Sequence, residues 1–367
     1  MRSKQFIVGP VELYPETKKV YQKEFTYFRT KEFGDIVKKS LKNLNELIGN
    51  KNPDSIIYLT ASGTAAMEAV VENCTNKNDK CLVINGGAFG KRFCELLEYH
   101  SIKYTAVNLE WNEILTYKHI AKYANKGYTM LFVNLHETST GQLYDIKMLS
   151  DFAKKNNMYL VVDAISTFLA DEYNMEQQGI DVTIISSQKG LCLSPGLSFI
   201  SFSDRMLEKI NTCKTPSASK YFDFKDYLKN IQRGQTPYTP AVFIIYELQD
   251  MLELIKKEGG INARLDFIKT KSKYFRQKIQ KTGLQVPNYP LSNMLTPVIF
   301  EDISACDVIQ IMKDKYKIFL NPCGGKLADI LIRVSHIGNT SIEDIDNLIV
   351  KLQLVINEIR EKNYVKQ

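Results

Sequence analysis

Two ionisable residues directly follow short apolar runs and could carry out chemistry. Asp163 ends the run Tyr159–Val162, and Lys189 comes shortly after Val182–Ser186. A carboxylate at the end of a buried strand is costly unless a cation meets it, although Asp163 could equally cap a helix. A lysine here could be a solvated surface charge, but a buried lysine has a lowered pKa and can act as a nucleophile. The pair predicts a reactive amine near a carboxylate.

A third feature is the start of a helix. Ser62-Gly63-Thr64 follows the apolar run Ile56–Thr60 and opens a segment whose apolar residues recur at helical spacing. Free backbone N–H groups and the helix dipole favour an anion there, and glycine lets a phosphate approach closely. The tripeptide could also be an ordinary helix cap. A second glycine cluster, Asn85–Gly90, lacks the G-x-G-x-x-G spacing, so no dinucleotide site is predicted.

These three features together match the requirements of pyridoxal phosphate. The lysine would carry the cofactor aldehyde, and the carboxylate would keep the pyridine nitrogen protonated. The helix start would bind the phosphate. We therefore expect pyridoxal 5'-phosphate as the cofactor.

A sheet has to position these residues. Short apolar runs alternate with helical patterns from Ile56 to Phe202, which predicts an α/β fold with a mostly parallel central sheet and helices on both faces. Ligands bind at the carboxyl ends of the strands in such sheets. We expect a large cofactor-binding domain over residues 1–255 and a small α+β domain over residues 256–367. The amino-terminal residues should form an arm that caps the small domain or reaches a partner subunit.

Composition excludes several classes of protein. The 367 residues carry a net charge of +7, but Lys and Arg are spread along the chain, so no nucleic-acid surface is predicted. The apolar runs are too short for a membrane span or a signal peptide, which predicts a cytoplasmic protein without membrane contact. Seven cysteines without a C-x-x-C pair and four scattered histidines predict reduced thiols and no metal site.

Ten short motifs occur in an order typical of one family. From about Phe6 to about Leu354 the chain resembles the class V aminotransferases of the fold-type I pyridoxal-phosphate superfamily. This group includes alanine-glyoxylate, serine-pyruvate and 2-aminoethylphosphonate-pyruvate transaminases. Each motif alone is weak, but the ordered set is specific. The motifs are Gly9-Pro10-Val11, Phe28–Phe33, Ser62–Ala69, Asn85–Arg92, His136–Gly141, Val162–Ser166, Ser187-Gln188-Lys189, Pro195-Gly196, Gly234–Pro240 and Arg333–Gly338.

The resemblance implies roles for individual residues. Lys189 and Asp163 would be catalytic, the first carrying the cofactor and the second pairing with its ring nitrogen. Phe89 stands where the family has a ring-stacking Trp or Tyr, and it can stack without donating a hydrogen bond. The other implied cofactor contacts are Ser62, Gly63, Thr64, Thr138 and Gln188, with Tyr238 or Thr239 reaching in from the second subunit of a homodimer. The implied substrate contacts are Arg333, as a fork for a carboxylate, together with Arg29 and Gly9.

The resemblance implies an aminotransferase with ping-pong kinetics, in which Lys189 is the general base. Two motifs, Asn85–Gly90 and His136–Gly141, favour 2-aminoethylphosphonate as the donor and pyruvate as the acceptor. Gly234–Pro240 favours the alternative, an alanine- or serine-glyoxylate or serine-pyruvate enzyme. A cysteine desulfurase-like lyase is a further alternative, with Cys323 as its nucleophile. The last alternative is a non-enzymatic binding protein that reuses the fold. The sequence leaves open the substrates, the metabolic direction, fusion to other domains and assembly beyond a dimer.

Overall fold

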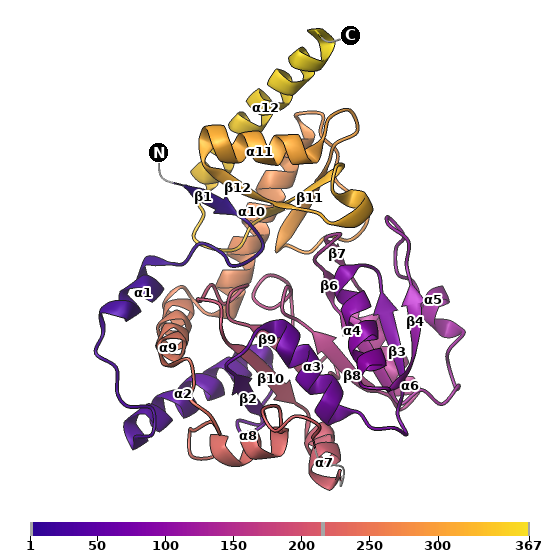
Figure 1. Ribbon diagram of the computed structural model, residues 1–367, viewed down its shortest axis with the longest axis vertical. Helices are drawn as coiled ribbons and strands as arrows, with labels where there is room; N and C mark the ends of the chain where they lie inside the picture. Colours follow the sequence, from indigo (N-terminus) through magenta and orange to yellow (C-terminus); the bar gives the residue numbers. More distant parts are fainter. Residues whose placement is uncertain (1–2, 214–216, 366–367) are drawn as a thin grey trace.

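A seven-stranded sheet forms the centre of the protein (Figure 1). The computed structural model describes residues 3–213 and 217–365. The strand order across the sheet is β2-β10-β9-β8-β5-β3-β4. Along the chain the strands are β2 (Ile56–Leu59), β3 (Lys80–Asn85), β4 (Lys103–Asn108), β5 (Met130–Asn134), β8 (Tyr159–Asp163), β9 (Val182–Ser186) and β10 (Ser198–Phe202).

The direction of the strands brings most of their carboxyl ends to one edge. From β9 to β4 every strand is parallel to its neighbours, whereas β10 runs antiparallel to both β2 and β9. Strand β2 therefore points the same way as the other five. Every residue of β2, β5 and β9 is buried, as expected for parallel strands covered on both faces. The predicted α/β fold with a mostly parallel sheet is confirmed.

Two local features do not follow from the apolar runs of the sequence. The edge strand β4 is partly exposed and mixes polar with apolar residues, so it forms no continuous apolar run. Helix α8 begins at Phe224, after the turn-forming Asp223. The carboxylate of Asp223 accepts a hydrogen bond from the backbone N–H of Lys225 (3.1 Å) and caps the helix there.

Helices pack against this sheet and against one another. Helix α2 lies against α9, α3 contacts β9 and β10, and α4 contacts β3. A short hairpin, β6 (His136–Glu137) with β7 (Gln142–Leu143), follows β5. The helical segments of this part of the chain are α1 (Pro15–Lys18), the 3-10 turn η1 (Lys19–Gln22), α2 (Lys31–Ile48), α3 (Gly63–Cys74), α4 (Ala88–Tyr99), α5 (Tyr117–Ala121), α6 (Ile146–Lys155), α7 (Asp204–Thr212), α8 (Phe224–Ile231) and α9 (Val242–Lys257).

A second sheet of four strands lies beside the first and has the order β1-β12-β13-β11 (Figure 1). It packs around its own apolar cluster, to which the amino-terminal arm contributes Phe6 of β1. The predicted boundary at residue 255 falls inside α9 and stays a prediction. The elements of this unit are β1 (Lys4–Phe6), α10 (Ile261–Gln280), β11 (Leu295–Ile299), α11 (Ala305–Tyr316), β12 (Ile318–Pro322), the 3-10 turn η2 (Gly325–Leu327), β13 (Leu331–Ser335) and α12 (Ile342–Val365).

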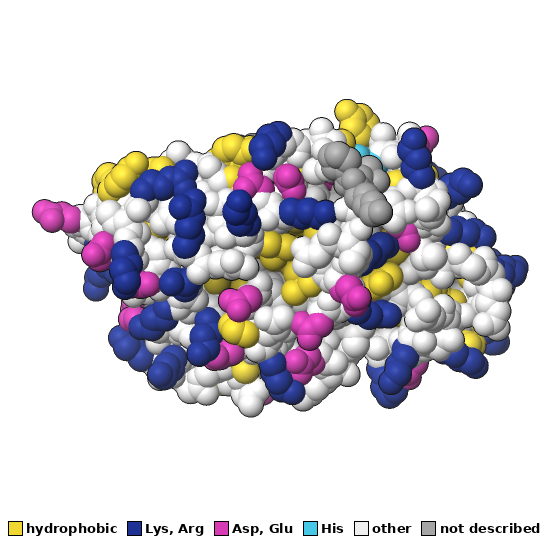
Figure 2. Space-filling view, turned by 90° about the horizontal axis from the view of Figure 1, so that it is seen from below, with side chains coloured by type: hydrophobic (Ala, Val, Ile, Leu, Met, Phe, Trp, Pro, Cys, Tyr) yellow, Lys and Arg dark blue, Asp and Glu magenta, His cyan; other side chains and the backbone are white. Residues whose placement is uncertain are grey.

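The surface and the thiols agree with the composition. Lysine and arginine side chains lie among aspartate and glutamate side chains on the face shown in Figure 2. Five of the seven cysteines, Cys74, Cys81, Cys94, Cys192 and Cys323, are buried thiols. No helix within residues 3–213 and 217–365 has both the length and the apolar character needed to cross a bilayer.

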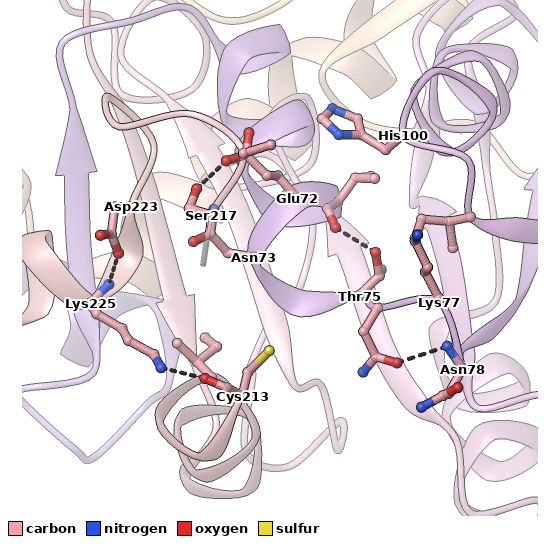
Figure 3. Close-up of a pocket in the computed structure, with 15 residues that line it drawn as sticks. Glu72, Asn73, Thr75, Lys77, Asn78, His100, Cys213, Ser217, Asp223 and Lys225 are labelled. Atoms are coloured by element: carbon pink, nitrogen blue, oxygen red, sulfur yellow. Dashed lines mark hydrogen bonds between the residues drawn. The ribbon is translucent and has the colours of Figure 1, made fainter. Parts of the chain in front are cut away.

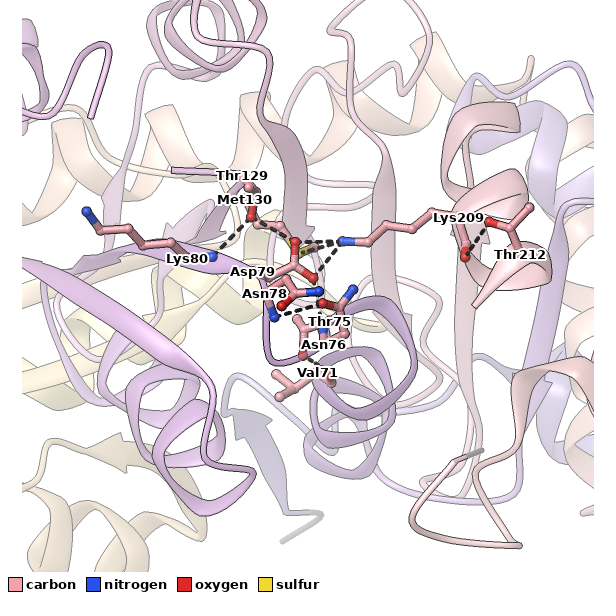
Figure 4. A network of polar contacts seen from close by, with 10 residues as sticks. All are labelled: Val71, Thr75, Asn76, Asn78, Asp79, Lys80, Thr129, Met130, Lys209 and Thr212. Atoms are coloured by element: carbon pink, nitrogen blue, oxygen red, sulfur yellow. Dashed lines mark hydrogen bonds and ion pairs between the residues drawn. The ribbon is translucent and has the colours of Figure 1, made fainter. Parts of the chain in front are cut away.

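A buried ion pair ties α7 to the amino edge of the large sheet (Figure 4). Both carboxylate oxygens of Asp79 accept hydrogen bonds from Nζ of Lys209, at 3.0 and 2.9 Å. Asp79 also accepts from Oγ1 of Thr129 (2.8 Å) and from the backbone N–H of Asn76 (2.9 Å). Because Asp79 is only 6% exposed, its charge depends on these partners.

We expect Lys209→Met to lower the free energy of unfolding by about 2 kcal/mol, because it leaves a buried carboxylate without its cation. Urea unfolding followed by circular dichroism measures the change. Lys31→Met is the control: Lys31 pairs with Asp35 at the surface, where both side chains are largely exposed, and we expect no measurable change. Equal effects of the two substitutions would contradict the assignment.

Candidate active site

A cavity of about 180 Å³ lies at the carboxyl edge of the large sheet. Its residues come from the amino-terminal arm, from the ends of β5, β8 and β9, and from the starts of α3 and α4. It brings together nine of the residues predicted from the sequence, namely Gly9, Ser62, Gly63, Thr64, Phe89, Thr138, Asp163, Gln188 and Lys189. Met67, Arg92, Asn134, Ile165 and Ser166 complete the lining.

Asp163 is the last residue of β8 and is 1% exposed. Its carboxylate accepts hydrogen bonds from the backbone N–H of Ile165 and from Nδ2 of Asn134, both at 2.9 Å. Asn134 reaches it because the two residues are register partners on adjacent strands. Burial raises the pKa of Asp163 to about 6, and these hydrogen bonds limit the rise. The described residues provide no ion-pair partner for this carboxylate.

Lys189 follows β9 and is half-buried in the cavity. Burial lowers its pKa to about 8, and the charge of Arg333 acts in the same direction. Nζ has no hydrogen-bond partner among the described residues, so the amine is free to react. Gly9 gives the lysine stem its room: a Cβ there would lie 2.8 Å from Cδ of Lys189, and its φ of +133° favours glycine.

The start of α3 forms a second wall. Oγ of Ser62 accepts a hydrogen bond from the backbone N–H of Ala65 (3.3 Å). Helix geometry gives the N–H groups of Gly63 and Thr64 no partner within the helix, so they can bind an anion. Arg92, one turn into α4, donates from Nη1 to Oγ1 of Thr64 (3.3 Å) and adds a positive charge at this wall.

Phe89 and Thr138 lie on the remaining walls. Phe89 is in the first turn of α4, and the guanidinium carbon of Arg92 lies 5.0 Å from the centre of its ring. Thr138 is buried, and its hydroxyl lies 2.6 Å from Oγ of Ser166.

Arg333 comes from β13 of the small unit and lies beside the cavity without lining it. Two backbone carbonyls orient its guanidinium: Nη1 donates to the oxygen of Thr138 (2.9 Å) and Nη2 to that of Pro322 (2.5 Å). Its Nε is buried and has no hydrogen-bond partner. The residue as a whole is only partly buried, so its guanidinium can also contact a ligand.

Besides Arg333, three more of the predicted site residues lie outside the cavity of the single chain. Arg29 donates to the backbone oxygens of Thr236 (2.9 Å) and Pro237 (3.3 Å), so it orders the loop that follows α8. On that loop the hydroxyl of Tyr238 donates to the backbone oxygen of Lys220, and Thr239 is exposed. Their predicted contact with a second subunit stays a prediction.

Sequence reasoning missed three polar residues of the cavity as contacts. Arg92 and Ser166 stand inside recognised motifs, and helical spacing from Phe89 could have indicated Arg92. Asn134 ends an apolar run in the same way as Asp163, so its position was the available signal.

A larger cavity of about 880 Å³ lies at the other end of α3 (Figure 3). Its polar groups bond to one another: Thr75 donates to the backbone oxygen of Val71 (2.6 Å), and Ser217 donates to Glu72. None of the site residues predicted from the sequence is among those that line it. We therefore place the chemistry at the smaller cavity.

The fold and the lysine–carboxylate cavity define the chain as a transferase of fold type I. The model of the family described as aminotransferase class-V matches residues 14–348, so the chain belongs to this family. In general the family depends on pyridoxal phosphate.

Named relatives cover nearly the whole chain. The soluble hydrogenase 42 kDa subunit of Anabaena cylindrica is 30% identical over 349 residues, which are 92% of this chain and 88% of that protein. The alanine–glyoxylate aminotransferase of Felis catus is 27% identical over 94% of this chain and 85% of its own length. The crystal structure of an alanine–glyoxylate aminotransferase from Nostoc sp. is 24% identical and has the same fold, with a TM-score of 0.89 over 97% of this chain and 96% of that one.

The described residues fit the cofactor of this family. Asp163 is a buried carboxylate that lacks a cation, which a protonated ring nitrogen would supply. Lys189 offers an amine without a hydrogen-bond partner, and the start of α3 with Arg92 offers a site for a phosphate. The buried Oδ1 of Asn134 and Oγ of Ser186 also lack partners.

We expect Asp163→Asn to stabilise the cofactor-free protein at neutral pH. The pKa of Asp163 in the folded protein, about 6, lies above its ordinary value of 3.8. Its contribution to stability is therefore present below about pH 4 and is lost as the pH rises through about 6. Two pKa units correspond to about 3 kcal/mol. Asparagine carries no charge, and Asn134 can turn its unpartnered Oδ1 toward the new amide.

Urea unfolding of the two cofactor-free proteins at about pH 4 and about pH 7 measures this effect. The stability of the variant relative to the wild type should rise between the two pH values by about 2 kcal/mol, because the unfolded carboxyl is already partly ionised at pH 4. A relative stability that does not change with pH would contradict the buried charge.

Proposed function

We propose that the protein uses pyridoxal 5'-phosphate, bound at Lys189, to transfer an amino group from a small donor to a keto acid. One observation carries the proposal: Lys189 and Asp163, at the ends of adjacent strands, share one cavity. Membership of the class-V aminotransferase family supports the reaction type.

The walls of the cavity give each residue a role toward the cofactor. Bound pyridoxal phosphate supplies an aldehyde that accepts an amine and a ring that withdraws electrons. Phe89 would stack on the ring, and Thr138 would contact its polar edge. The phosphate would lie at the start of α3, against Ser62, Gly63 and Thr64, with Gln188 beside it.

Two groups of the chain would handle protons. Asp163 would keep a proton on the ring nitrogen, and the pairing would favour its own ionised form. Nζ of Lys189 would take a proton from the donor carbon and deliver it to the carbon that was the aldehyde of the cofactor. Because the pKa of Lys189 is about 8, a larger fraction of its amine is neutral near pH 7 than for an ordinary lysine.

The donor class follows from the cations near the cavity. Arg333 is positioned to hold a carboxylate, which favours a small amino acid, and the name of the relative from Felis catus supports glyoxylate as the acceptor. This is the alternative raised from the sequence, and we take it as the main proposal. The other candidate is 2-aminoethylphosphonate with pyruvate, which the motifs Asn85–Gly90 and His136–Gly141 favour.

Assembly of two chains would complete the site. Thr239 is exposed, and the loop that carries it is held by Arg29 and by the stacking of Tyr238 on Tyr221 (5.0 Å between ring centres). A preformed exposed loop of this kind can reach the cavity of a second copy. We therefore propose a homodimer with shared sites.

The lyase alternative has less support from the structure. A desulfurase needs a mobile, reactive cysteine near the lysine. Cys323 is buried, and its Sγ donates to the backbone oxygen of Ser139 (3.2 Å). Burial also raises the pKa of its thiol, so the thiolate is disfavoured.

We expect Lys189→Ala to lower turnover by about a thousandfold or more, because it removes both the cofactor attachment and the base. The visible absorption of the lysine-bound cofactor should disappear, and borohydride should no longer fix the cofactor to the chain. Lys147→Ala is the control, since Lys147 is exposed on α6. A Lys189 variant that kept the absorption and the turnover would overturn the proposal.

Single half-reactions identify the donor. We expect alanine or serine to convert the bound cofactor from its aldehyde to its amine form, seen as a change in the visible spectrum. Arg333→Gln should raise the KM for that donor by about tenfold or more, because a charge-assisted pair contributes roughly 1.5–3 kcal/mol. Conversion by 2-aminoethylphosphonate, with no conversion by alanine or serine, would favour the other candidate.

A further inference from the structure

Helix α4, which presents Phe89 to the cavity, has no capping side chain of its own. Its N-cap residue is Gly87, and its first turn contains Ala88, Phe89 and Gly90. The N–H groups of a first turn lack acceptors within the helix and need them from elsewhere. The position of Phe89 therefore depends on what accepts these hydrogen bonds.

Two residues of the neighbouring hairpin provide the acceptors. The carboxylate of Glu137 accepts from the backbone N–H of Gly90 (3.0 Å) and of Phe89 (3.4 Å). Oγ of Ser139 accepts from the N–H of Ala88 (3.1 Å) and itself donates to Glu137. Glu137 is fully buried, so its carboxylate is held by these donors and by the positive end of the helix dipole.

Gly87 makes this close approach possible. A Cβ on Gly87 would meet Oγ of Ser139 and would lie 2.6 Å from Cδ of Glu137. The backbone at Gly87 is extended, with a φ of 168°, so any residue could adopt it. Position 87 therefore needs glycine because a side chain would collide with Glu137 and Ser139, and not because of its backbone conformation.

The same hairpin forms another wall of the cavity and receives the small unit. Thr138 lines the cavity, and its backbone oxygen accepts from Arg333. The next two backbone oxygens accept from Sγ of Cys323 (3.2 Å) and from the hydroxyl of Tyr289 (2.5 Å). Glu137 therefore lies between the helix that carries Phe89 and the turn that carries Thr138 and holds Arg333.

We propose that Glu137 is a positioning residue, which fixes Phe89 relative to Thr138 and so sets the width of the slot for the cofactor ring. The inference rests on the proposed function, because it assumes that a planar cofactor occupies the slot. Glu137 touches neither the cofactor nor the substrate in this scheme and acts through the backbone of α4.

Glu137→Gln tests the proposal, because an amide cannot accept from all the donors that now face the carboxylate. In the cofactor-free variant, hydrogen exchange of the amides of Phe89 and Gly90 should be at least about tenfold faster. The dissociation constant for pyridoxal phosphate, from its visible absorption, should rise by about tenfold or more. The induced circular dichroism of the bound cofactor should fall, because the stacking geometry is lost.

Gly87→Ala is the second variant and keeps the test decisive if Glu137→Gln does not fold. Its methyl group pushes the hairpin from α4, so the same changes in exchange, affinity and dichroism are expected.

Asp181→Asn is the matched control. Asp181 is also a buried carboxylate that accepts from a backbone N–H (Leu160, 2.8 Å) and a serine hydroxyl (Ser203, 2.7 Å). Within the described residues Asp181, unlike Glu137, also forms an ion pair, with Arg205, and it lies at the amino end of β9. The Asp181→Asn substitution should lower the unfolding temperature, yet it should change the dissociation constant for pyridoxal phosphate by less than about twofold.

The outcomes distinguish failure of the proposed function from failure of the role inferred for Glu137. A wild type that bound no pyridoxal phosphate would overturn the proposed function and this inference with it. A wild type that bound the cofactor, with Glu137→Gln or Gly87→Ala showing unchanged affinity, dichroism and amide exchange, would overturn the inference alone. Loss of stability without these changes would show that Glu137 has a purely structural role.

Discussion

The common direction of six strands in the large sheet is the constraint on which the site depends. Parallel strands end at the same edge, so residues far apart in the sequence, such as Ser62, Asp163 and Lys189, meet there. The antiparallel strand β10 does not disturb this arrangement, because β2 on its far side again points with the others. The walls of the cavity are then supplied by the helix starts that follow these strands.

Burial sets the electrostatics of this edge. It raises the pKa of Asp163 and lowers those of Lys189 and Arg333, so burial disfavours the charged form of each group. Such groups gain from a ligand of opposite charge. A cofactor with a cationic ring nitrogen would stabilise the charge of Asp163, and a substrate with a carboxylate would stabilise that of Arg333.

The sequence predicts the parts of this site that follow directly from strands. Asp163 and Lys189 stand close after short apolar runs, and the ordered motifs indicate Phe89, Thr138 and Arg333 as neighbours. Asp163, Lys189, Phe89 and Thr138 line one cavity, and their roles stay predictions. Arg333 approaches from the small unit instead of lining the cavity.

Other features depend on tertiary contacts that no local pattern encodes. The edge strand β4 has little apolar periodicity. In the sequence Glu137 is only one residue within a motif. Its contact with α4 depends on hydrogen bonds from Phe89 and Gly90, which lie 48 and 47 residues away in the sequence. The loop with Tyr238 packs against its own chain, so the sequence cannot tell this contact from one with a second chain.

The pairing of β1 with β12 has a consequence for the order of folding. Lys4 lies opposite Ile318 and Phe6 opposite Leu320, so β1 finds its partner only after all the strands of the large sheet have been made. The large sheet, by contrast, is complete in sequence by Phe202. The entropic cost of closing so long a loop grows only slowly with length, but contacts of this kind form late. During synthesis the apolar side chain of Phe6 therefore stays unpaired until β12 has been made.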